Sequence, residues 1–157
     1  MKTKAIFLNH FEVLLIAVSC DSNDDPAITA ADVNAAELQS TAQDGQWRIT
    51  YYFDSDKEET SDYAGYVFTF GADGTVSATN GTTEVTGTWS VTDSSSSDDD
   101  SFDDSSDVDF NLFFTTPADF EELTDDWDIL EYSSSRIRLI DVSGGDGSTD
   151  YLTFEKI

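Results

Sequence analysis

The amino-acid sequence predicts an all-β fold, an up-and-down antiparallel β-barrel of about eight strands. From residue 45 onward, apolar and polar residues alternate with a period of two, which is typical of half-buried strands. The segments between the strands have the length of hairpin connections, whereas parallel strands need crossovers of about a dozen residues or more. About eight antiparallel strands are enough to close a sheet on itself, so a barrel is favoured over a two-sheet sandwich.

The segments that carry the alternation are 47–53, 66–70, 75–79, 82–92, 108–114, 127–132, 136–142 and 151–155. Between them, Ala72-Asp73-Gly74 predicts a tight turn. Asn80-Gly81 predicts a hairpin with a type I′ turn, in which both central residues need positive φ. Pro117–Leu123 predicts a short helical turn with proline at its start, where the missing N–H costs no hydrogen bond.

Residues 1–19 have the features of an export signal. Lys2 and Lys4 are followed by apolar runs and small residues, and then by Cys20, the only cysteine of the chain. This order is the plan of a lipoprotein signal, in which the cysteine is lipidated and becomes the mature N-terminus. An ordinary secretory peptide is the alternative. Residues 9–12 interrupt the apolar run, whereas a membrane-spanning helix needs about 18 uninterrupted apolar residues.

Residues 20–44 are small, polar and acidic, and we expect a flexible tether between the anchor and a barrel domain of residues 45–157. The Ala-rich part, 28–38, could also form a short helix. The acidic residues directly after Cys20 resemble the export tags of surface-displayed lipoproteins of the Bacteroidetes, although a solvated linker would have the same composition. The sequence thus predicts a protein of the cell envelope, anchored by lipid to the outer membrane and exposed at the surface.

The charge of the chain excludes several functions. It has 33 Asp and Glu residues against 7 Lys and Arg, a formal net charge of -26. Such a surface repels nucleic acid, because binding there depends on neutralising phosphates, and it attracts cations. The only histidine, His10, and the only cysteine lie before the predicted barrel. Cys–His or Ser–His–Asp catalysis and zinc sites of His or Cys are therefore excluded from the domain. We expect no cofactor and no internal disulfide.

Gly45 and Trp47 open the first predicted strand, and this Gly-x-Trp start resembles the lipocalin superfamily. The tryptophan of that family closes the barrel floor and packs against an arginine from near the last strand. The resemblance implies that Arg136 or Arg138 lies over Trp47, as a cation–π contact. Together with the predicted lipid anchor and acidic tether, the sequence from Gly45 onward resembles the small lipocalin-like lipoproteins of the Bacteroidetes.

The resemblance implies a binding module that holds a small apolar ligand inside the barrel. The residues expected to line that interior are Ile49, Tyr51, Phe68, Phe70, Trp89, Phe110 and Leu112. Alternating aromatic residues are also what any small barrel needs for its core. A filled, non-catalytic barrel that acts as a surface scaffold is therefore the alternative.

The acidic loop after residue 93 offers weak Ca²⁺ binding, because calcium prefers clustered carboxylate oxygens. The residues concerned are Asp98, Asp99, Asp100, Asp103 and Asp104. A solvated loop without a bound ion is the alternative. No segment has the full EF-hand order, since Asp54-x-Asp56-x-Glu58 lacks the required glycine. We expect no enzymatic activity, because only carboxylate chemistry is left and no pair lies in a recognisable motif. Protein partners and the oligomeric state stay open.

Overall fold

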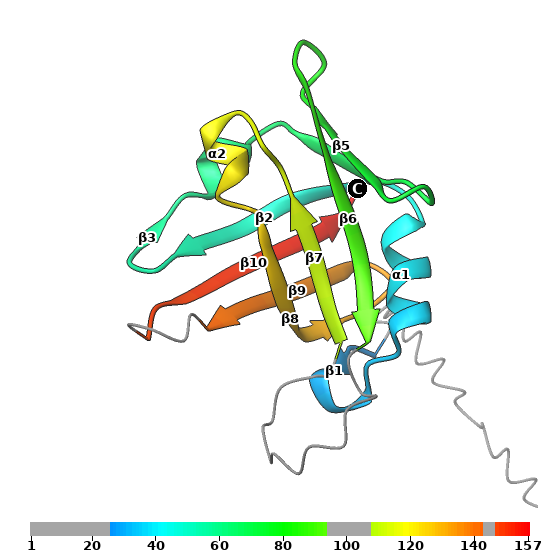
Figure 1. Cartoon of the computed structure of the whole chain (residues 1–157). Coiled ribbons are helices and arrows are strands. Elements are labelled where there is room, and N and C mark those ends of the chain that lie inside the picture. Colours follow the sequence, from blue (N-terminus) through cyan, green and yellow to red (C-terminus); the bar gives the residue numbers. More distant parts are fainter. Residues whose placement is uncertain (1–25, 94–107, 143–146) are drawn as a thin grey trace, which may run out of the picture.

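The computed structural model describes residues 26–93, 108–142 and 147–157. Eight strands form one closed antiparallel barrel in the order β2-β4-β5-β6-β7-β8-β9-β10, and β10 pairs with β2 to complete the ring (Figure 1). The elements in chain order are β1 (Ile28–Thr29), η1 (Ala30–Asp32), α1 (Ala35–Gln43), β2 (Trp47–Asp54), β3 (Lys57–Glu58), η2 (Thr60–Tyr63), β4 (Val67–Phe70), β5 (Thr75–Thr79), β6 (Glu84–Asp93), β7 (Val108–Phe113), α2 (Ala118–Glu121), β8 (Asp125–Tyr132), β9 (Arg136–Val142) and β10 (Thr149–Lys156).

The topology is the predicted up-and-down meander. Apart from the closing pair of β2 and β10, neighbouring strands of the ring follow one another along the chain, and the short strands β1 and β3 pair outside it. Each predicted segment contains a strand, and α2 occupies the predicted helical turn after Pro117. The predicted fold class, an all-β antiparallel barrel of eight strands, is confirmed.

The segment from Pro26 to Asp44 belongs to the folded domain, which corrects this part of the expected tether, whereas residues 20–25 lie outside the described residues. β1 pairs with β8, and α1 lies against β4 and β6 (Figure 1). Leu38 and Ala42 of α1 are fully buried. These residues are four apart and therefore share one face of the helix. Because only one leucine and one alanine mark this face, the sequence pattern indicated a linker. The predicted signal and Cys20 lie outside the described residues.

Trp47 lies at the end of the barrel where β2 begins. The basic residue over its ring is a lysine and not the expected arginine. The side chain is fully buried, and its indole N–H donates to the carbonyl oxygen of Ala42 in α1 at 2.8 Å. The Nζ atom of Lys156 lies 5.5 Å from the centroid of the Trp47 ring and pairs with Asp44 at 2.8 Å. Gly45, with φ of 98°, lies beside this lysine, because a Cβ there would come within 2.9 Å of the Cε atom of Lys156.

The expected contact of Arg136 or Arg138 with Trp47 is wrong. Ile137 and Leu139 point into the barrel, so the arginines between them point outward, because successive side chains of a strand alternate between its faces. Both guanidinium groups pair with Glu131 on β8, at 3.3 and 3.2 Å.

β2 contains one extra residue opposite β10, and this bulge corrects the expected position of Tyr51. Thr153 pairs with Tyr51, whereas the next residue of β10 pairs with Ile49, so Thr50 is the extra residue. Beyond a bulge the alternation shifts by one residue. Tyr52 is therefore buried inside the barrel, and Tyr51 lies on the outer face with 42% of its surface exposed.

The hairpin at Asn80-Gly81 is confirmed, but its turn is not of type I′. β5 and β6 pair from Thr79 and Glu84, which leaves a loop of residues 80–83. The Asn80 side-chain oxygen accepts hydrogen bonds from the backbone N–H groups of Thr82 and Thr83. Gly81 has positive φ and Asn80 does not. These hydrogen bonds to the asparagine side chain stabilise a loop that is longer than the predicted two-residue turn.

Leu38→Ala tests whether α1 is part of the core. We expect the free energy of unfolding to fall by about 2–4 kcal/mol, because a fully buried leucine is truncated. The neighbouring exposed Gln39→Ala is the matched control and should change it by less than about 0.5 kcal/mol. Equal effects of the two variants in urea denaturation would contradict the docking of α1.

Candidate functional site

Aromatic side chains occupy the interior of the barrel. Of the residues expected to line a ligand cavity, all except Tyr51 are buried there: Ile49, Phe68, Phe70, Trp89, Phe110 and Leu112. The ring of Phe70 has its centroid 5.0 Å from Trp89, 5.4 Å from Phe110 and 5.5 Å from Phe154. These are the edge-to-face contacts that aromatic rings prefer. The expected lining residues therefore pack against one another as a core.

α2 covers the end of the barrel opposite to α1 (Figure 1). Its Phe120 is buried, and the ring centroid lies 5.0 Å from Tyr66, 5.5 Å from Tyr63 and 5.3 Å from Phe114. An open hollow of about 280 Å³ lies on the outer face of β5, β6 and β7, and none of its lining residues is charged. The hollow therefore offers no charged group for chemistry, whereas carboxylates gather beside α2.

The carboxylate groups of Asp54, Glu59 and Glu122 converge at the α2 end of the barrel, and we call these residues the carboxylate cluster. One oxygen from each side chain lies within 4.8 Å of those of the other two. Asp54 ends β2, Glu59 follows β3, and Glu122 caps α2. Asp54 and Glu59 are half-buried, and Glu122 is exposed.

Two buried tyrosines hold the elements that carry the carboxylate cluster. The Tyr52 hydroxyl donates to the backbone oxygen of Glu122 at 2.8 Å, and the Tyr63 hydroxyl donates to the backbone oxygen of Asp119. The backbone N–H of Glu59 donates to the Tyr52 carbonyl at 3.0 Å. Tyr52 therefore positions both glutamates, and it reaches them because the bulge turns its side chain inward.

The turn between β2 and β3 is strained beside the cluster. Ser55 has φ of 53°, in the left-handed region that favours glycine. Its backbone N–H donates to Oδ1 of Asp150 on β10 at 2.7 Å, which ties the turn to the barrel. Strain of this kind persists only where surrounding contacts hold it, and it is common at functional sites.

The two glutamates of the cluster have pKa values shifted in opposite directions. The Lys57 ammonium, which pairs with Glu59, lowers the pKa of Glu59. Desolvation, a hydrogen bond with Glu59 and the nearby charge of Asp54 raise the pKa of Glu122. Burial, together with the charges of Asp54 and Glu122, also raises the pKa of Tyr52, which keeps its hydroxyl protonated. Lys57 thus favours the charged form of Glu59, whereas burial and the negative charges around Glu122 favour its neutral form.

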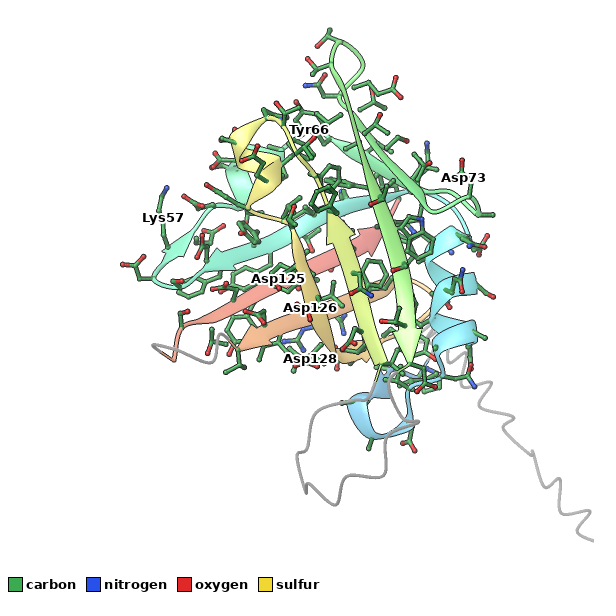
Figure 2. All side chains as sticks on the ribbon, viewed as in Figure 1. Lys57, Tyr66, Asp73, Asp125, Asp126 and Asp128 are labelled. Atoms are coloured by element: carbon green, nitrogen blue, oxygen red, sulfur yellow. The ribbon has the colours of Figure 1, made fainter. Side chains whose placement is uncertain are left out.

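Further carboxylates extend this acidic end along β8, where Figure 2 shows Asp125, Asp126 and Asp128. Burial raises the pKa of Asp125 to about 6 against a hydrogen bond from the backbone N–H of Asp126, and the charge of Asp141 adds to the rise. Burial and the charges of Asp109 and Asp141 also raise the pKa of Asp128. The whole end of the barrel is therefore a region of strong negative potential.

This arrangement can hold a hard cation. Ca²⁺ takes oxygen ligands in flexible geometry, and the carboxylate cluster supplies three side chains from separate elements. Sequence reasoning noted Asp54 as the start of an incomplete EF-hand pattern but missed Glu59 and Glu122, because the fold brings them together from distant parts of the chain. The loop residues Asp98, Asp99, Asp100, Asp103 and Asp104 lie outside the described residues. Within the described ranges, no helix has the length and apolar character to cross a bilayer.

No protein-family model and no curated protein matches the chain. Among solved structures, the chain is similar to a DUF4847 family protein from Bacteroides vulgatus. The two chains are 17% identical with a TM-score of 0.44, and the match covers 76% of this chain and 97% of that chain.

Asp125→Asn tests the pH dependence of the acidic end. The pKa of Asp125 is about 6 in the fold against 3.8 for the ordinary group, so folding takes up a proton between these values. The free energy of unfolding therefore falls as the pH rises through this window. We expect Asp125→Asn to raise the melting temperature at about pH 7.5 and to leave it nearly unchanged at about pH 4.

Asp73→Asn provides a control of opposite sign. Hydrogen bonds from Thr75 lower the pKa of Asp73, so its carboxylate stabilises the fold above its ordinary pKa and this contribution is lost at lower pH. The variant should lower the melting temperature near neutral pH. An Asp125→Asn variant that is less stable than the native chain at about pH 7.5 would contradict the assignment.

Proposed function

We propose that this protein is a lipid-anchored, lipocalin-like barrel of the cell envelope that binds a divalent cation, without enzymatic activity. The observation that carries the proposal is the convergence of Asp54, Glu59 and Glu122 within 4.8 Å. Placing three carboxylates together is unfavourable without a counter-charge, and Lys57, which pairs with Glu59, supplies only part of it. A divalent cation supplies the rest.

The packing of the interior favours this proposal over the carriage of an apolar ligand. Phe70, Trp89 and Phe110 contact one another inside the barrel, and helices cover both of its ends. An apolar ligand would have to displace these rings, whereas a cation needs no such space. The carboxylate cluster lies outside the aromatic core and is accessible through the exposed Glu122.

Calcium fits the cluster better than magnesium. Mg²⁺ demands near-octahedral geometry, whereas Ca²⁺ accepts irregular oxygen ligands and water. The cluster combines two half-buried carboxylates with one exposed carboxylate, so water can complete the coordination. The glutamate pair is also too close for glycosidase chemistry, which needs carboxyl groups about 5 Å or more apart, because carboxylate oxygens of Glu59 and Glu122 lie within 4.8 Å of each other.

Calcium should stabilise the fold through the cluster. For a dissociation constant of about 1 mM, calcium at about 10 mM raises the free energy of unfolding by about 1.4 kcal/mol. That gain corresponds to roughly 5 °C in melting temperature. Glu122→Gln should abolish the shift and keep the fold, because Tyr52 bonds to the backbone oxygen of Glu122 and not to its side chain. The exposed neighbour Glu121→Gln is the matched control and should keep the shift.

A second variant separates the cluster from the acidic loop. It replaces Asp98, Asp99, Asp100, Asp103 and Asp104 by asparagine and should keep the full calcium shift. Loss of the shift in this variant, with retention in Glu122→Gln, would overturn the cluster as the site. The native shift should also shrink at low pH, because protons compete with calcium for Glu122, whose pKa is raised.

The lipid anchor is tested separately from the cation. In cells grown with a labelled fatty acid, we expect label on the native chain and none on Cys20→Ser. Ser19→Ala controls for a change beside the processing site and should keep the label. Equal labelling of the native chain and Cys20→Ser would contradict the anchor and leave the calcium measurement unaffected.

A further inference from the structure

The outer face of β2, β10 and β9 carries all three arginines of the sequence, and we call it the arginine wall. In the strand register, Glu155 of β10 lies between Arg48 of β2 and Arg136 of β9. Thr153 of β10 lies opposite Arg138 of β9. Figure 1 shows these three strands side by side. Apart from Lys57 and Lys156, the basic residues of the described domain all lie here.

An apolar row crosses the same wall toward the acidic end of the barrel. Tyr151 pairs with Phe53 on one side and with Ile140 on the other. Each end of the row is acidic, because Phe53 pairs with Glu58 of β3 and Ile140 pairs with Asp128 of β8. Phe53, Tyr151, Ile140 and Asp128 each have a core residue beside them in their strand and point outward, and Glu58 shares the face of Phe53, with which it pairs. Tyr51, beside the row, is 42% exposed, and the centroid of its ring lies 6.5 Å from that of Phe53.

The charge of this wall differs from that of the whole chain. The wall has three arginines and the carboxylate of Glu155, and the flanking strands β3 and β8 add the carboxylates of Glu58, Asp128 and Glu131, which pair with its edges. The whole chain has a formal net charge of -26, which makes two copies repel each other across most of their surfaces. The arginine wall is nearly neutral and has exposed aromatic side chains, the composition that distinguishes protein interfaces.

We propose that two copies of this protein form a dimer through the arginine wall. The two-fold axis lies in the interface and crosses the strands at the level of Thr153. The axis runs perpendicular to the strands, so each strand faces its own counterpart in the opposite direction. The end of the wall with Arg48 and Arg136 then lies over the apolar row of the other copy and the acidic residues beside it. An interface of this kind is self-complementary, as a two-fold dimer requires.

The register determines which groups meet. Arg48 lies over Phe53 of the partner subunit and next to Glu58 of the partner subunit, which combines a cation–π contact with an ion pair. Arg136 lies over Ile140 of the partner subunit and next to Asp128 of the partner subunit. Each contact occurs twice, and both copies of Tyr151 become covered. Arg138 lies at the level of the axis and faces Arg138 of the partner subunit, each paired with Glu131 of its own copy.

Cross-linking of the full-length protein in its own membrane tests the dimer. Thr153→Cys places a thiol near the axis, and a bifunctional maleimide that spans about 10 Å matches the separation of packed sheets. We expect most of this variant to migrate as a covalent dimer. Ser90→Cys, an exposed residue of β6 on the opposite wall, is the matched control and measures chance encounters. Cross-linking of Thr153→Cys no greater than that of Ser90→Cys would overturn the proposal.

A second substitution tests which surface makes the contact. Tyr51→Glu, added to Thr153→Cys, brings a negative charge into the apolar row at an exposed position that the fold tolerates. We expect the cross-linked fraction to fall to the level of the Ser90→Cys control. A cross-linked fraction that is unchanged by Tyr51→Glu would place the contact elsewhere and overturn the proposal.

Discussion

The extra residue of β2 opposite β10 is the feature on which both surfaces of interest depend. Without the bulge at Thr50, strict alternation would turn Tyr51 inward and Tyr52 outward. With it, Tyr52 enters the barrel and bonds to the backbone of Glu122, which fixes α2. The same shift brings Asp54 to the acidic end and leaves Tyr51 on the outer wall. One inserted residue thus positions the carboxylate cluster and creates the exposed aromatic surface.

The closing contact between β2 and β10 is the natural place for such a shift. These strands lie far apart in the sequence and must meet for the ring to lose its edges. A bulge bends the strand and increases its twist, which helps a sheet to close. β8 has a second irregularity in its pairing with β9, between Ile129 and Glu131. There the shift turns Glu131 outward, where it meets both arginines of β9.

The strong negative charge is distributed unevenly over the barrel. At the α2 end, burial and the nearby carboxylates raise the pKa values of Glu122 and Asp125. On the arginine wall, the few basic residues balance their acidic neighbours. Lys156 has a separate role, because it joins Trp47 to Asp44 where α1 meets the barrel. The aromatic core supplies the stability that these charged regions oppose.

The sequence was sufficient for the local pattern and for what the chemistry excludes. Alternation with a period of two and the turn residues predicted the eight strands, since burial of one face imposes that period on any strand. The positions of His10 and Cys20 removed thiol and imidazole chemistry from the domain. Trp47 of the Gly-x-Trp start is buried where β2 begins and bonds to Ala42 of α1.

Contacts between distant segments needed the folded chain. Lys156, and not an arginine, covers Trp47, because the face of a strand on which a residue lies depends on its register. Glu122 joins Asp54 and Glu59 only because Tyr52 holds α2 against the barrel. The docking of α1 rests on a single leucine and an alanine. Alternation alone indicates that successive side chains of a strand lie on opposite faces of the sheet. Bulges, closure of the barrel and helix docking decide which of these side chains face the core and which residues they contact.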